Sequence, residues 1–228
     1  MSSSAASPQL WHDATIGNML TKDRLSSYLR ATSGDLEHAL LLYEWNTRAA
    51  GAVIQTVALT EVLLRNSMDR RLIAWARKKS HQGSWLSVIP LDSRGIADIR
   101  AARFRATKSG KRKELHGKVI AELSFGFWRY LVTRRYLTTL WIPALKDAFP
   151  HGAADIGRRR AEVEQTMNSI VFIRNRAAHH EPIHRRDLVA DFQTIVALCH
   201  WTHPEAGAWV ASTSTLPGVI AERTELGI

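Results

Sequence analysis

The sequence of 228 residues contains a single cysteine, Cys199. One thiol excludes an internal disulfide and a cysteine-rich zinc module, and it is typical of a protein that works in a reducing compartment. Cys199 lies on an apolar helical pattern without a basic neighbour that would stabilise a thiolate, so we do not expect a cysteine nucleophile. The sequence also lacks a glycine-rich phosphate loop and a nucleotide-binding fingerprint.

Acidic residues are few: 21 Asp and Glu face 31 Lys and Arg, which gives a formal net charge of +10. With 45% hydrophobic residues, the chain is too apolar for a disordered polycation. Much of the positive charge is clustered, at Arg70–Arg71, 77–79, 108–113, Arg134–Arg135, 158–160 and Arg185–Arg186. Such a surface favours a polyanion, with nucleic acid as the expected partner. The alternative is a set of ordinary solvated helix faces that are rich in arginine.

Long hydrophobic runs are missing as well. The most apolar stretch, 49–64, contains Gln55, Thr56, Thr60 and Glu61, which makes it too polar for a typical bilayer span. The opening residues, MSSSAASPQLWHD, have neither the basic nor the apolar region of a secretory signal. We therefore expect a soluble, cytoplasmic protein without membrane contact.

The pattern that is present is helical almost throughout. Apolar residues recur at spacings of three and four, whereas alternating runs and hairpin turns such as Asn-Gly are absent. The expected helices cover about 21–31, 35–79, 92–106, 114–132, 155–180, 186–201 and 216–222, with a short one between Pro143 and Pro150. The segment 35–79 is either one helix or two helices broken near Asn46 or Gly51, and Gly126 indicates either a kink or a close packing contact within 114–132.

These elements predict one all-α domain over residues 1–228. It would have an N-terminal extension helix within 1–32 and a C-terminal tail helix within 203–228. The two long helices, near 46–79 and 155–180, are candidates for an antiparallel central pair. Pro182 ends the second of them, because proline disfavours helical geometry in the residue before it.

The most informative segment is the end of the 155–180 helix. Two stripes run along it, Val163, Met167, Ile170, Arg174, Ala178 and Met167, Val171, Asn175, His179, and both change from apolar to polar near the end. Charged and amide groups on an inward face are costly unless they are paired. Either this end of the helix opens into a cleft, or Arg174, Asn175 and His179 form an internal network.

A guanidinium, an amide and an imidazole on one helix face can bind a phosphodiester and move protons at it. A structural role is the alternative, with Arg174 paired to a carboxylate, Asn175 capping a backbone group and the histidines fraying at the helix end. Metal binding by His179, His180 and His184 is not expected, because adjacent histidines diverge on a helix and no Cys or Asp ligand lies in suitable spacing. We expect no cofactor.

The run from Ile173 to Pro182, IRNRAAHHEP, resembles the R-polar-x-x-x-H motif of the HEPN superfamily, and within it the Abi-like (abortive infection) family. Two further blocks, 61–69 (EVLLRNSMD) and 122–128 (ELSFGFW), resemble the N-terminal helix and central block of that family. The resemblance extends over about residues 35–200.

The resemblance implies a HEPN-like helical bundle that forms a homodimer, with two motifs meeting across the two-fold axis in one composite site. It implies a metal-independent endoribonuclease that attacks RNA through the 2′-OH, leaving a cyclic phosphate and a 5′-OH. Arg174, Asn175 and His179 would be its catalytic residues. It also implies a toxin of phage defence, restrained by an RNA or protein antitoxin.

Other residues are candidates for support. Arg65 and Asn66 echo Arg174 and Asn175, and the packing of the two long helices can bring them close; equally, Glu61 and Arg65 can form an ordinary surface ion pair. His180 and Glu181 either assist the site or fray.

The expected RNA-binding side chains are Arg176, Arg185, Arg186, Lys111, Arg112 and Lys113. Phe125, Phe127 and Trp128 can stack on bases, although at that spacing they are more typical of a core. The rival function is a non-catalytic helical module that binds RNA or a partner, as an antitoxin or adaptor.

Overall fold

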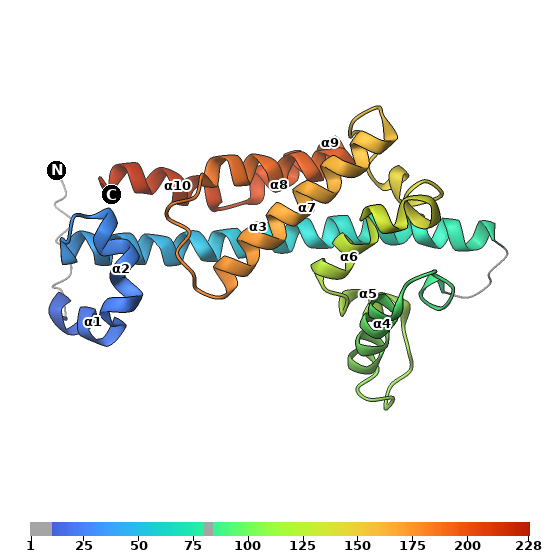
Figure 1. Ribbon diagram of the computed structural model, residues 1–228, viewed down its shortest axis with the longest axis horizontal. Helices are drawn as coiled ribbons and strands as arrows, with labels where there is room; N and C mark the ends of the chain where they lie inside the picture. Colours follow the sequence, from blue (N-terminus) through green and yellow to red (C-terminus); the bar gives the residue numbers. More distant parts are fainter. Residues whose placement is uncertain (1–10, 80–83) are drawn as a thin grey trace, which may run out of the picture.

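A single helix, α3 (Leu36–Lys78), runs through the protein and organises the other elements around it (Figure 1). The computed structural model describes residues 11–79 and 84–228, so the predictions for 1–10 and 80–83 lie outside the described residues. Asp35 caps the start of α3 by accepting a hydrogen bond from the His38 amide at 3.1 Å. The helix continues unbroken through Asn46 and Gly51, which decides in favour of one long helix.

Helix α7 (Ile156–Ala178) crosses α3 obliquely and runs in the opposite direction, so the predicted antiparallel central pair is confirmed (Figure 1). Helices α8 (Leu188–Thr202), α9 (Pro204–Thr213) and α10 (Leu216–Glu225) follow, and together they form a layer that packs along α3 (Figure 1). Helices α1 (Asp13–Leu20) and α2 (Lys22–Ala31) pack at its N-terminal end. The described residues form no strand, and the protein is all-α.

The remaining elements lie around the C-terminal half of α3. Helices α4 (Ser93–Ala106) and α5 (His116–Ala121) form an arm that projects away from α3, whereas α6 (Phe125–Leu131) packs against α3 and α7 (Figure 1). Short helical turns follow at η1 (Trp85–Ser87), η2 (Arg134–Tyr136), η3 (Leu137–Trp141) and η4 (Leu145–Ala148).

The segment 114–132 differs from the prediction of one helix kinked at Gly126. It forms two helices, and the break precedes Ser124, whose hydroxyl accepts a hydrogen bond from the Phe127 amide at 3.3 Å. A serine at this position favours a new helix start over continuation, because its side chain satisfies a free amide. Helices α1 and α9 were not anticipated as separate elements.

The core follows the buried face of α3 and includes four fully buried tryptophans, Trp45, Trp85, Trp128 and Trp141. Phe125, Phe127 and Trp128 belong to this core, which confirms their structural interpretation. By length and composition alone, α3 could cross a membrane; 44% of its most apolar window is buried inside the protein. A core helix passes the same criteria, so the absence of membrane contact stays a prediction.

Candidate functional site

The candidate site lies where α7 leaves the core. Asp155 starts this helix by accepting a hydrogen bond from the Arg158 amide at 2.6 Å. Val163, Met167 and Ile170 are at most 1% exposed, whereas Arg174 and Asn175 one turn later are exposed. Of the two alternatives drawn from the stripes, the open end of the helix is therefore the one observed, and an internal network is not formed.

Arg174 and Asn175 line a cavity of about 280 Å³ between α3, α6 and α7. We call it the first cavity; its lining residues are Glu61, Ser124, Phe125, Gly126, Val171, Arg174 and Asn175. The Arg174 guanidinium donates a hydrogen bond to Asn175 Oδ1 at 3.3 Å. Within the described chain no carboxylate lies within 4 Å of it, so most of its donors remain available to a ligand.

Glu61 brings a carboxylate to the same cavity from α3. Burial raises the pKa of its carboxyl, and the positive charges of Arg174 and then Arg65 oppose that shift. From the sequence, Glu61 is predicted only as a supporting residue, and the structure places it with Arg174 and Asn175. The ion pair between Glu61 and Arg65 is not formed among the residues described, where no contact within 4 Å joins them.

Arg65 and Asn66 have different positions. Arg65 is half-buried, its Nε atom lacks a hydrogen-bond partner, and its charge is felt by Glu61. Asn66 is exposed and does not line the first cavity. Arg65 follows Glu61 by one turn on α3 itself, and neither Arg65 nor Asn66 lines the first cavity with Arg174 and Asn175.

His179 is the first residue after α7, and its amide donates to the Asn175 carbonyl at 2.9 Å. Its ring is exposed, lines neither described cavity, and has no hydrogen-bond partner among the described side chains. His180 adopts a left-handed conformation with φ 56° and is exposed. Glu181 forms an ion pair with Arg176 at 3.5 Å, so it is engaged within the chain.

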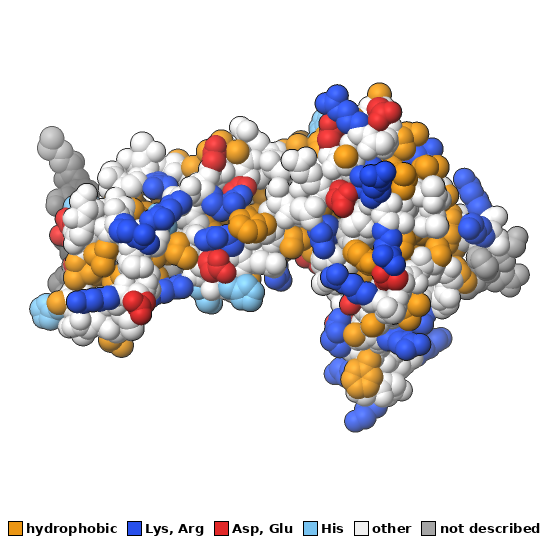
Figure 2. Space-filling model, in the orientation of Figure 1, with side chains coloured by type: hydrophobic (Ala, Val, Ile, Leu, Met, Phe, Trp, Pro, Cys, Tyr) orange, Lys and Arg blue, Asp and Glu red, His pale blue; other side chains and the backbone are white. Residues whose placement is uncertain are grey.

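The predicted RNA-binding residues fall into two groups. Lys111, Arg112 and Lys113 are exposed in the turn between α4 and α5, on the arm where Figure 2 shows many basic side chains. Arg176, Arg185 and Arg186 lie near the end of α7. Arg185 is exposed, but Arg186 forms a two-point ion pair with Asp191 at 2.8 and 2.5 Å, which neutralises it. Arg176 and Arg186 also pack on the ring of Phe172.

The loop after α7 is held by residues that the sequence analysis did not identify. The buried Asn46 accepts hydrogen bonds from the amides of Ile183 and His184 at 2.8 and 3.0 Å. The Arg223 guanidinium donates to the His184 carbonyl at 2.6 Å. Asn46 is a polar residue among the buried apolar residues of α3, and this position could have indicated a structural hydrogen bond. From the sequence it is a candidate only for a break in the helix.

His184 is 2% exposed and contacts Ser27 Oγ through its Nε2 atom at 2.7 Å. Its ring stacks on Tyr28 at a centroid distance of 4.8 Å. Burial lowers its pKa to about 4, and the charges of Arg185 and Arg223 act in the same direction, so the ring is neutral near pH 7. Burial raises the pKa of the Cys199 thiol to about 11, which agrees with a structural cysteine.

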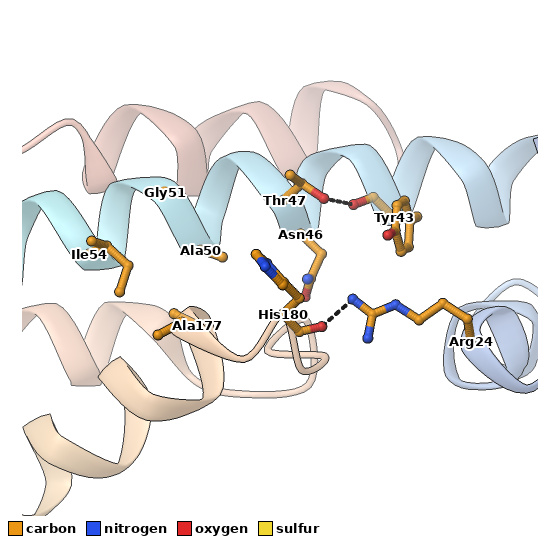
Figure 3. Close-up of a pocket in the computed structure, with 10 residues that line it drawn as sticks. Arg24, Tyr43, Asn46, Thr47, Ala50, Gly51, Ile54, Ala177 and His180 are labelled. Atoms are coloured by element: carbon orange, nitrogen blue, oxygen red, sulfur yellow. Dashed lines mark hydrogen bonds between the residues drawn. The ribbon is translucent and has the colours of Figure 1, made fainter. Parts of the chain in front are cut away.

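A second cavity, of about 340 Å³, lies between α2, α3 and the C-terminal end of α7 (Figure 3). It is lined by Arg24, Tyr43, Asn46, Thr47, Ala50, Gly51, Ile54, Ala177, Ala178 and His180. The Arg24 guanidinium reaches from α2 to the carbonyl of His180 and packs 5.6 Å from the centre of the Tyr43 ring. No pattern in the sequence predicts this cavity, because Arg24 of α2 and the end of α7 come together only in the folded chain.

Within residues 11–79 and 84–228, no group of three or more His, Cys, Asp and Glu side chains is arranged to hold a metal ion. Comparisons of the chain with protein-family models, with curated proteins and with solved structures found no match.

Proposed function

We propose that the protein is a metal-independent endoribonuclease of the HEPN type that acts as a homodimer. The observation that carries the proposal is the exposed end of α7. Arg174 and Asn175 are exposed one turn beyond the buried Met167 and Ile170, His179 is exposed just after the helix, and Arg174 has no carboxylate partner within 4 Å among the described residues. A guanidinium without a carboxylate partner and an exposed imidazole five residues later are groups that suit a phosphodiester.

In the proposed reaction, a base removes the proton of the 2′-OH, and its oxygen forms a bond to the adjacent phosphorus. The bond from phosphorus to the 5′-oxygen breaks, and an acid donates a proton to that oxygen. The products are a 2′,3′-cyclic phosphate and a 5′-OH. Since the nucleophile belongs to the substrate, a bound water is not needed to supply it.

The residues of the chain fit these roles. His179 acts as the base or the acid, a contribution of roughly 10²–10⁴-fold for each proton transfer. Arg174 binds the phosphoryl oxygens and stabilises their growing negative charge. Asn175 accepts a hydrogen bond from Arg174, so it orients the guanidinium. Glu61 is close enough to affect Arg174 electrostatically and would hold it at the mouth of the first cavity.

The homodimer supplies the second imidazole. One His179 cannot lie on both sides of the scissile bond, whereas a two-fold axis near the end of α7 would place one on each side. The exposed position of His179, outside both cavities of the single chain, is compatible with such a composite site.

The cellular role that we propose is that of a toxin in abortive-infection defence, restrained by an RNA or protein antitoxin. This part rests on the resemblance of the run from Arg174 to Pro182 to the Abi-like motif. An antitoxin that covers the basic surface near Arg185 would block access of RNA to Arg174.

A second candidate function is a non-catalytic module that binds RNA or a partner protein. It is favoured by the unengaged ring of His179, which has neither an orienting hydrogen bond nor a cavity beside it among the described residues. In that case Arg174 and the basic arm would bind RNA without cutting it.

The deciding experiment incubates the purified protein with end-labelled RNA in EDTA. We expect cleavage that yields cyclic-phosphate ends, and we expect His179→Ala to abolish it while His38→Ala, an exposed histidine on α3, retains it. Binding without cleavage in every variant would establish the second candidate. Sedimentation provides the independent check, because a strictly monomeric protein cannot form the composite site.

A further inference from the structure

The second cavity has an apolar floor and a polar rim. Its floor consists of small or aliphatic side chains from α3 and α7, namely Ala50, Gly51, Ile54, Ala177 and Ala178. Its rim consists of Arg24, Tyr43, Asn46, Thr47 and His180. A volume of about 340 Å³ corresponds to roughly eleven water molecules, which is enough for a nucleobase and part of its sugar.

Gly51 keeps this space open. It lies in the middle of α3, where glycine lowers helix stability by ~1 kcal/mol relative to alanine. A Cβ built on Gly51 meets no atom within 4 Å, so close packing does not require glycine there. The residue therefore widens the cavity without serving a contact inside the chain.

The rim presents mainly hydrogen-bond donors. Asn46 is 3% exposed, and its Oδ1 atom is occupied by the amides of Ile183 and His184. Its Nδ2 group has no acceptor in the described part of the chain, and the residue lines the cavity. One guanidinium nitrogen of Arg24 donates to the His180 carbonyl, and its other donors have no protein acceptor among residues 11–79 and 84–228.

The charge of the rim has one sign. None of the ten lining residues is acidic, whereas Arg24 is cationic. A buried amide donor next to a guanidinium selects a ligand that is rich in acceptors and carries negative charge. The apolar floor suits a flat aromatic ring, and the Tyr43 ring packs against Arg24 at the rim. A nucleotide combines these properties.

The cavity also lies in the right place for RNA. Ala178, which lines the second cavity, is one helical turn, about 6 Å along the helix axis, beyond Arg174, which lines the first cavity, and His179 stands between Ala178 and His180 in the chain. An RNA strand that places a phosphate on Arg174 and His179 would bring the neighbouring nucleotide to the second cavity.

We infer that the second cavity is a nucleotide subsite, in which the base rests on the floor around Gly51 and Asn46 and Arg24 bind its acceptors and phosphate. This inference rests on the proposed ribonuclease function for the identity of the polymer. It extends that function, because the second cavity would bind the nucleotide beside the scissile phosphate.

The test measures binding of the four nucleoside monophosphates by titration calorimetry, and RNA cleavage in the same preparations. Gly51→Leu fills the cavity from an exposed helix position and improves helix propensity, so the fold should persist. We expect at least a tenfold loss of affinity for the preferred nucleotide and a rise in KM for RNA. Gly218→Leu is the matched control, because it is also an exposed helical glycine with open space around its Cβ.

Asn46→Asp provides a second variant. It retains the oxygen that holds Ile183 and His184 but replaces the Nδ2 donor with an acceptor, and we expect nucleotide affinity to fall at least tenfold. Nucleotide binding that is lost in both variants, in a protein that does not cut RNA, would support the subsite and refute the nuclease. Cleavage and nucleotide affinity that are unchanged in Gly51→Leu would overturn the subsite and leave the nuclease intact.

Discussion

The end of α7 and the loop that follows it are neighbours in sequence, yet they are held very differently. The loop at 183–184 is fixed by Asn46, Ser27 and Arg223 through hydrogen bonds of 2.6–3.0 Å. Arg174 has only a 3.3 Å contact to its neighbour Asn175, and the His179 ring has no partner among the described residues. Side chains that lack partners but sit on a firmly held backbone are suited to bind something outside the chain.

The strongest way to test this contrast is to remove the unengaged imidazole. We expect His179→Ala to lower RNA cleavage by roughly 10²–10⁴-fold, the usual contribution of a proton-transferring side chain, while the melting temperature stays unchanged. Single-turnover cleavage and calorimetry measure the two quantities. If His179→Ala instead lowers the melting temperature, and cleavage falls only as much as the fraction of folded protein falls, His179 has a structural role.

The opposite change removes the support of the loop. Asn46→Ala would leave the buried amides of Ile183 and His184 without their acceptor, and we expect the free energy of unfolding to fall by roughly 2–4 kcal/mol. Urea denaturation measures the change. Asn66→Ala, on the exposed face of the same helix, is the control and should leave stability within about 0.5 kcal/mol. Equal effects of the two substitutions would contradict the conclusion that Asn46 holds the loop at 183–184.

The lowered pKa of His184, in the loop at 183–184, predicts that the stability of the folded protein depends on pH. Its pKa is lowered from 6.5 to about 4 in the folded protein, so between these values the unfolded chain binds a proton that the folded chain does not. Stability should therefore fall as pH drops from about 6.5 toward 4, by roughly 3 kcal/mol from this group, and level off below. Urea midpoints across this range should decline less steeply in His184→Gln than in the unchanged protein, and parallel curves would refute the assignment.

The smallest effect concerns charges far from the motif. Replacing Lys111, Arg112 and Lys113 together by alanine should weaken RNA binding equally for all sequences and reduce the salt slope by up to about three, with cleavage of saturating RNA unchanged. Titrations at several salt concentrations measure this. An unchanged slope would show that the arm contacts no RNA phosphate and that its charge is only solvated.

Much of the secondary structure follows from local chemistry. Asp35, Asp92 and Asp155 each begin a helix as expected, because a carboxylate satisfies a free amide within the same turn. The break before Ser124 was missed, since apolar spacing that is helical throughout 114–132 does not show where one helix ends and the next begins. For the site, the stripes located Arg174 and Asn175 but left open whether they face a cleft or the core.

By itself, the sequence determined that the protein is all-α, that α7 changes from apolar to polar along two stripes near its end, and that basic residues outnumber acidic ones. These are properties of neighbouring residues, and short-range geometry is enough to read them. Only the tertiary structure decided that Glu61 shares a cavity with Arg174, and that Arg24 and Asn46 border another beside His180. Such groupings join residues more than a hundred positions apart, and they depend on how helix faces pack, which no local pattern records.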